Sequence, residues 1–341
     1  MTNRKHYLDN LRVVTILMLF PYHTFMIYNN WGEAFYVNGE ALAFPSMFIH
    51  INWVWMMPLL FAVAGISSRY ALRRRSAGEY AKERVNRLLV PLIFGLLLLI
   101  PIQAYLASLF HKGEANYLDY FTKLTDFWGT DGAFTPGQLW FILFLFVISI
   151  ISLPFMLWHK KKGKDTLGDD IPLVLLLLLG LAPCIGNMLL EIGGRSPTEY
   201  LAYFLLGYFF LSNENVLEKL EKYRFLLLPI TIVGYILTSI FNHICYEAVS
   251  WFAILTLLGL GRHYLDFSGK KSGYLSKSSF GVYIFHQSWL VVTAFFILKL
   301  TSNYWIQIPL IMLGTIVLTF LTYEVASRIK VVSWMFGLKG R

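Results

Sequence analysis

The chain has 341 residues, of which 57% are hydrophobic and only 14% are charged. An ordinary soluble domain carries about 25% charged residues, so the composition excludes that class and indicates a protein with several membrane-spanning helices. The net charge of +9 does not indicate a nucleic-acid partner, because basic residues of membrane proteins gather in cytoplasmic loops.

The apolar stretches predict an all-α integral membrane protein with about ten transmembrane helices. Crossing the hydrocarbon core of a bilayer takes about 20 mostly apolar residues. Stretches near this length occur at 11–29, 48–68, 88–110, 138–158, 171–190, 198–212, 224–242, 247–265, 279–300 and 304–325. The sixth is short, and it could begin nearer Arg195 or end within 213–220.

The distribution of basic residues predicts the topology. With ten spans, 25 of the 29 Lys and Arg residues lie on the side of the two termini, which places both termini in the cytoplasm. The first stretch contains Arg12, Pro21 and His23 and lacks a small-residue cleavage site, so it is a retained span rather than a signal peptide. We expect residues 1–341 to form a single transmembrane domain in the cell membrane, with no appended soluble domain.

The first span carries two ionisable side chains, Arg12 and His23. Such groups cost several kcal/mol in lipid unless they have a partner or a water-filled cavity, so they are candidates for a functional site. In one continuous helix they would lie about 16 Å apart along the axis and on nearly the same face. Asp9 lies one turn before Arg12, which predicts an i,i+3 ion pair.

Neutral imidazole accepts protons near neutral pH, so His23 is a candidate general base for acyl transfer to a hydroxyl. Arg12 and Asp9 complete this catalytic group. The structural alternatives are that Arg12 is an ordinary interfacial cation and that His23 only bonds a neighbouring helix.

A second feature is the cytoplasmic segment 69–87, which carries seven basic residues. Arg84 and Arg87 lie three positions apart before the third span, where two guanidinium groups could bind phosphates. The segment could instead orient the protein against anionic lipid. The functional interpretation is binding of an anionic cytoplasmic donor, with coenzyme A as the candidate.

Further polar residues form a second tier. His286 and Gln287 lie in the ninth span, where an imidazole is expected to face the bundle interior. His50, Glu199 and Glu247 lie near the outer starts of spans and could orient His23, although a structural role at the interface is favoured. No phosphate loop, HExxH metal motif or GxSxG elbow occurs, and we expect no metal site.

These motifs resemble the membrane-bound acyltransferase family 3. The resemblance rests on Tyr7-Leu8-Asp9-Asn10-Leu11-Arg12 followed by His23, which fits the family's Arg-x10-His pattern, on Arg84-Val85-Asn86-Arg87, and on the segments 61–65, 139–141 (with Trp140) and 285–287. It covers nearly the whole chain. Ala64 stands where the family often has serine, and 87–103 looks closest to the glucan-modifying branch.

The resemblance implies transfer of an acyl group, of the acetyl or succinyl class, from cytoplasmic acyl-CoA to a hydroxyl of an extracytoplasmic or membrane-linked glycan. It implies that His23 acts as general base or acyl relay, that Arg12 contacts the donor, and that Arg84 and Arg87 bind its phosphates. The competing hypothesis is a secondary transporter of a polar solute or glycan precursor, with intramembrane charges along its path. A structural membrane subunit would leave Arg12 and His23 without a role.

Overall fold

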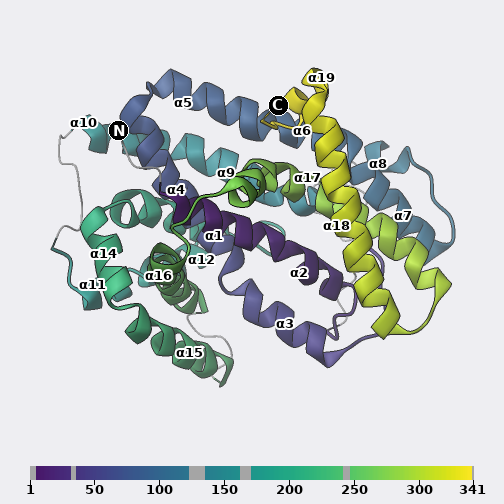
Figure 1. The fold of residues 1–341 in the computed structure, drawn as a ribbon, viewed down its shortest axis with the longest axis horizontal. Coiled ribbons are helices and arrows are strands. Elements are labelled where there is room, and N and C mark those ends of the chain that lie inside the picture. Colours follow the sequence, from purple (N-terminus) through teal and green to yellow (C-terminus); the bar gives the residue numbers. More distant parts are fainter. Residues whose placement is uncertain (1–4, 32–35, 123–134, 162–169, 241–245, 340–341) are drawn as a thin grey trace. The chain divides into compact units, whose positions relative to one another are not determined.

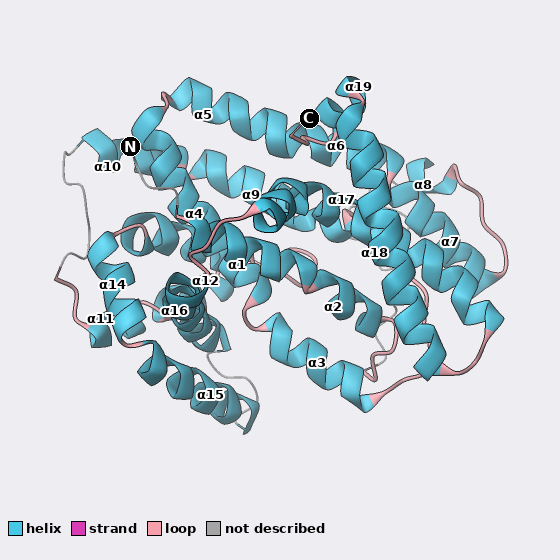
Figure 2. Ribbon diagram, viewed as in Figure 1, coloured by secondary structure: helices cyan, strands magenta, loops and turns pink. Residues whose placement is uncertain are grey.

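The computed structural model describes residues 5–31, 36–122, 135–161, 170–240 and 246–339. Within these residues the chain forms helices joined by turns and loops, and no β-strand occurs there (Figures 1 and 2). The predicted all-α class is confirmed.

Five helices in the described part of the chain are long and apolar enough to cross a membrane. They are Ala43–Arg74 (α3, Ala43–Trp53, and α4, Met56–Arg74), Ala77–Lys112 (α5, Ala77–Arg84, to α7, Ile100–Lys112), Gly137–Lys161 (η2, Gly137–Leu139, α9, Trp140–Ile151, and α10, Leu153–Lys161), α17 (Lys270–Leu300) and α18 (Tyr304–Arg328). The helices α14 (Glu214–Lys222) and α15 (Arg224–Ile240), bent by 77° at their junction, count as a sixth if they form one span.

The remaining predicted spans coincide with shorter or interrupted helices. These are α1 (His6–Leu17) with α2 (Leu19–Met26), α11 (Leu173–Leu178) with α12 (Leu181–Asn187), α13 (Pro197–Leu206) with the π-helical turn η3 (Gly207–Leu211), and α16 (Tyr246–Tyr264). The first break has a local cause, because Pro21 has no N–H to donate to the carbonyl of Leu17. The helix expected from Arg12 to His23 is therefore divided into two helices, which are separated by Met18.

The described residues fall into two compact units. Unit 1 comprises Met1–Thr15, Trp53–Arg84 and Phe144–Ser276, and unit 2 comprises Ile16–Asn52, Val85–Leu143 and Lys277–Arg341.

Unit 1 is built around α4, which packs against α13, η3 and α16. Two glycines permit this close packing. A Cβ atom on Gly65 would collide with the carbonyl oxygen of Phe204, and one on Gly207 would collide with that of Ala62. Small residues at such crossings let helix backbones approach closely inside membranes. The glycine at the end of the 61–65 motif thus has a packing role.

Unit 2 is organised around α17, α18 and α2, with α2 packed against α18. Its apolar core includes Ile27, Leu290 and Ile311, all almost fully buried. Besides α7, η2 and most of α3, this unit contains η1 (Val85–Leu89), α6 (Val90–Leu98), α8 (Asp119–Thr122) and α19 (Lys330–Met335). Most of α17 belongs to this unit, and its residues from Ser278 to Ser288 are buried except Phe280.

Candidate functional site

The Asp9 and Arg12 side chains of α1 form an ion pair in unit 1. Arg12 Nη2 donates to Asp9 Oδ1 at 2.5 Å, and the two side chains are 36% and 20% exposed. The predicted i,i+3 pairing is therefore present. Since the carboxylate lies one turn before the guanidinium on the same helix, the pair fixes the direction of the Arg12 side chain.

His23 of α2 lies beside His286 of α17 in unit 2. The two ring centroids are 5.1 Å apart, and the rings are inclined by 37°. Phe20, one turn before His23, contacts the His286 ring edge to face at 6.3 Å. The sequence placed both histidines among the candidates, and the structure brings them together although they are far apart along the chain.

The hydrogen bond of His286 fixes its tautomer. Nδ1 lies 2.7 Å from the carbonyl oxygen of Tyr283, and a carbonyl can only accept, so Nδ1 carries the proton. The lone pair is then on Nε2, which is buried and has no hydrogen-bond partner among the described residues. The residue as a whole is 1% exposed. His286 thus offers a fixed, unused acceptor in the interior of unit 2.

A buried polar network that was not predicted from the sequence connects Gln103 and Gln138 to residues of α17. Tyr283 donates its hydroxyl to the carbonyl oxygen of Gln138, and Gln138 Nε2 donates to that of Ile284 at 3.0 Å. Gln103 Nε2 donates to Gln138 Oε1 at 3.2 Å and to Ser288 Oγ at 2.8 Å. The signal available in the sequence was an amide side chain within the stretch 88–110 and another at the start of the stretch 138–158.

Three second-tier residues have simpler surroundings. Trp140 begins α9 and lies next to Phe141, whose ring contacts that of Tyr283 at 5.6 Å. Gln287 is buried beside His286. His50 is exposed on α3, and its ring centroid lies 5.0 Å from that of Trp31.

The two glutamates proposed for the outer surface lie in unit 1. The backbone N–H of Glu199 donates to Ser196 Oγ at 3.1 Å, which caps the start of α13. Glu247 Oε1 accepts from Asn187 Nδ2 at 2.6 Å. Both residues thus take part in local contacts of this unit.

The two arginines of the 84–87 element differ in setting. Arg84 ends α5, its guanidinium lies 4.6 Å from the Tyr80 ring centroid, and its Nη2 donates to Ser68 Oγ at 3.2 Å. Tyr80 donates its hydroxyl to the same Ser68 oxygen at 2.9 Å. Arg87 lies in the π-helical turn η1 and is exposed. Arg84 is therefore held in one orientation by unit 1.

Arg69 stands out among the basic residues of segment 69–87, because it is only 6% exposed. Its Nη1 donates to Nδ1 of the buried His159 at 2.7 Å, and its guanidinium lies 5.2 Å from the Tyr208 ring centroid. In the sequence, Arg69 is indistinguishable from the other basic residues of the segment.

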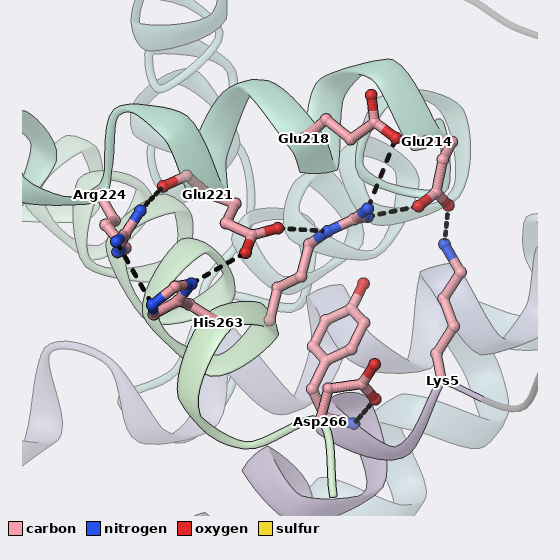
Figure 3. Close-up of polar contacts among 9 residues, drawn as sticks. Lys5, Glu214, Glu218, Glu221, Arg224, His263 and Asp266 are labelled. Carbon is pink, nitrogen blue, oxygen red and sulfur yellow. Dashed lines mark hydrogen bonds and ion pairs between the residues drawn. The ribbon is translucent and has the colours of Figure 1, made fainter.

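A charged cluster in unit 1 joins α14, the end of α16 and the chain around Lys5 (Figure 3). Arg262 contacts three carboxylates, at 2.5 Å from Glu214, 2.8 Å from Glu221 and 3.6 Å from Glu218. Lys5 also pairs with Glu214. His263 Nδ1 donates to Glu221 Oε1 at 3.0 Å. The ion pairs of this cluster connect α14 to α16 and to Lys5. The charged side chains of the cluster are thus paired with one another.

Within the described residues, no group of three or more His, Cys, Asp or Glu side chains is arranged to hold a metal ion. The available chemistry consists of an imidazole pair, a buried amide network and oriented guanidinium groups. Imidazole suits proton transfer, and guanidinium groups suit binding of phosphate.

Comparison with known proteins gives one consistent result. The family model described as an acyltransferase domain, acyltransferase 3, matches residues 5–324. A curated protein of Escherichia coli, "Glucans biosynthesis protein C", is 22% identical over 376 residues, with 98% of this chain and 95% of that protein covered. A protein of the same name from Salmonella schwarzengrund is 25% identical over 176 residues, with 48% and 42% covered. No solved structure matches the chain.

Proposed function

Because the chain belongs to the acyltransferase 3 family, whose model covers residues 5–324, it is a membrane acyltransferase, and we propose that it acylates a glycan hydroxyl. The proposed donor is cytoplasmic acetyl-CoA or succinyl-CoA. The proposed acceptor is an extracytoplasmic or membrane-linked glucan, since the similar curated proteins are named for glucan biosynthesis.

The observation that carries the proposal is the pairing of His23 with His286 in unit 2. An imidazole in an apolar interior is costly unless it has a function or a partner, and here two are placed 5.1 Å apart. We assign His23 as the general base. In a variant of the scheme it is acylated and relays the acyl group.

The proposed reaction is acyl transfer from a thioester to an alcohol. The acceptor oxygen attacks the thioester carbonyl carbon, a C–O bond forms, and the C–S bond breaks. His23 takes the hydroxyl proton, which then passes to the leaving thiolate, so that atoms and charges balance. The chain itself supplies the base and the orientation of both substrates.

We assign the donor phosphates to Arg84 and Arg87, with Arg12 and its partner Asp9 also on the donor side. The support is clearest for Arg84. Its side chain is fixed by Ser68 and Tyr80, and its buried Nε has no hydrogen-bond partner among the described residues. Planar guanidinium groups bind phosphate through paired N–H donors.

The proposed topology has ten spans with both termini in the cytoplasm and the protein in the cell membrane as a single domain. The distribution of Lys and Arg supports it. The basic segment 69–87 then faces the donor compartment. His23 lies after Arg12 in the outward direction of the first span, toward the acceptor compartment.

The test is acyl transfer by the purified full chain in lipid nanodiscs. Acetyl-CoA and succinyl-CoA are each supplied with a glucose oligosaccharide, free thiol is followed over time, and the product mass is determined. Release of thiol that depends on the oligosaccharide, with an added acetyl or succinyl mass, supports the proposal. Thiol release without an acylated product, or none with either donor, would refute it.

A cellular experiment tests the acceptor class. Surface and periplasmic glucans from cells with and without the gene are compared by mass spectrometry. The proposal predicts loss of an acyl mass from one glucan when the gene is deleted. Identical glucan masses in the two strains would contradict the acceptor assignment.

A further inference from the structure

His286 Nε2 is a hydrogen-bond acceptor with a fixed direction and no partner. The bond from Nδ1 to the Tyr283 carbonyl oxygen leaves the lone pair on Nε2, and that atom is buried without a partner among the described residues. A buried acceptor left without a hydrogen bond is energetically unfavourable, because it has lost its hydrogen bonds to water. A ligand that donates a hydrogen bond there would therefore gain affinity.

The polar side chains of the network on this helix direct their printed hydrogen bonds to other acceptors. Tyr283 already donates its hydroxyl to the Gln138 carbonyl oxygen, and Gln138 Nε2 donates to that of Ile284. Gln103 Nε2 has two acceptors of its own. Phe20, which contacts the His286 ring, has no polar atom. Among the described residues none donates to Nε2, so a bound molecule with a hydrogen-bond donor can fill this position.

The spacing of the two imidazoles indicates how many donors that molecule needs. A hydroxyl group carries one hydrogen and can donate it to one acceptor at a time. The hydroxyl whose proton goes to His23 therefore cannot also donate to His286. With the ring centroids 5.1 Å apart, a second hydroxyl attached close to the first can reach the second ring.

We propose that His286 Nε2 accepts a hydrogen bond from a second hydroxyl of the same sugar whose reacting hydroxyl faces His23, so that the site selects a polyol unit over a simple alcohol. The proposal rests on the proposed function, because it takes His23 as the base for the reacting hydroxyl. It adds a binding residue for the acceptor and a reason for sugar specificity. Gln287, the next residue of α17, is also buried, and its Oε1 has no hydrogen-bond partner among the described residues.

The decisive experiment removes the hydrogen bond from each side in turn. The acceptors are methyl β-glucoside and its monodeoxy derivatives. Each is tested with the wild-type chain, with His286→Leu and with His286→Gln, and kcat/KM is measured for every combination of protein and acceptor. In the wild type, one deoxy derivative that still carries the acylated hydroxyl should react about 10- to 100-fold more slowly, because Nε2 is left unpaired. In His286→Leu that ratio should fall to within about twofold, since the acceptor atom is gone.

The conservative variant separates binding from structural damage. The amide oxygen of Gln can accept a hydrogen bond, so His286→Gln should recover part of the discrimination. The matched control is Gln307→Met, a buried amide of the same unit whose two ends bond Tyr28 and Thr301. It should lower the unfolding temperature but keep the wild-type ratio between acceptors.

The possible outcomes distinguish this inference from the proposed function. Two results would overturn the role of His286 and leave the acyltransferase assignment intact. In the first, the wild type acylates every deoxy derivative as fast as methyl β-glucoside. In the second, the kcat/KM ratio between the two acceptors is the same in the wild type and in His286→Leu. If no acyl transfer occurs, binding of the same glucosides is measured by saturation-transfer NMR. Weaker binding of one deoxy derivative to the wild type only would then support the site, and equal or absent binding would overturn it.

Discussion

The charged cluster of unit 1 and the histidine pair of unit 2 are two polar regions of one largely apolar chain, and they differ in how their groups are satisfied. In the cluster, Arg262 contacts three carboxylates and His263 donates to Glu221. In the pair, His286 keeps a buried acceptor atom without a partner in the described residues. A cluster that uses its charges internally stabilises the fold, whereas an unused acceptor is available for a ligand.

The largest expected effect comes from the histidine pair. His23→Ala should lower kcat for acyl transfer by about 10²–10⁴-fold, because a positioned general base contributes that much, while the thermal unfolding midpoint changes little. The measurement is oligosaccharide-dependent thiol release by the purified variant. The matched control is His111→Ala, an exposed histidine of unit 2, which should retain full activity. Transfer by His23→Ala at the wild-type rate would rule out His23 as the base.

The packing of unit 1 gives the next effect. Gly65→Leu should destabilise the protein by about 1–3 kcal/mol or prevent its folding, because even a Cβ atom there collides with the Phe204 carbonyl oxygen. Gly78→Ala in α5 is the control, since no atom lies within 4 Å of its added Cβ, and alanine favours a helix. Thermal unfolding in detergent checks both. Equal melting of Gly65→Leu and wild type would contradict the close crossing of α4 and α13.

A smaller change in stability is expected from the charged cluster. Arg262→Met leaves three carboxylates without their shared cation and should cost about 1–2 kcal/mol, more than a surface pair but less than a fully buried one. Arg328→Met removes a single exposed i,i+4 pair with Glu324 and should cost about 0.3–0.5 kcal/mol. Both variants should keep acyl transfer. A loss of activity in Arg262→Met without a loss of stability would give the cluster a functional role.

The smallest effect is a pH dependence of the same cluster. The hydrogen bond from His263, followed by that from Arg262, lowers the pKa of Glu221 below its usual range. The stability that this carboxylate contributes is therefore present above the unfolded value of about 4.3 and is lost as the pH falls through the lowered folded pKa.

This dependence is checked by thermal unfolding at a series of pH values below about 6. Glu221→Gln should flatten the acid limb of the profile, whereas Glu114→Gln, at an exposed residue of unit 2, should leave it unchanged. An acid limb of unaltered slope in Glu221→Gln would show that the destabilisation originates elsewhere.

Local features of the site were predictable from the sequence. The Asp9–Arg12 pair depends only on helical spacing, and it is present. The single helix expected from Arg12 to His23 is divided into α1 and α2 at Met18, before Pro21. That residue was visible in the sequence and its missing N–H predicts a local break. The roles of Arg12, Arg84 and Arg87 remain predictions.

The amino-acid sequence by itself determined that the chain is an all-α membrane protein, which family it resembles, and that His23 and His286 are unusual for their surroundings. Only the tertiary structure decided that these two histidines are neighbours and that the carbonyl oxygen of Tyr283 fixes the tautomer of His286. It also decided that Gln103 and Gln138 bond each other and residues of α17. Composition and helical periodicity are properties of short windows of sequence, and these contacts join helices that are far apart along the chain. Packing alone selects which of the many buried faces meet.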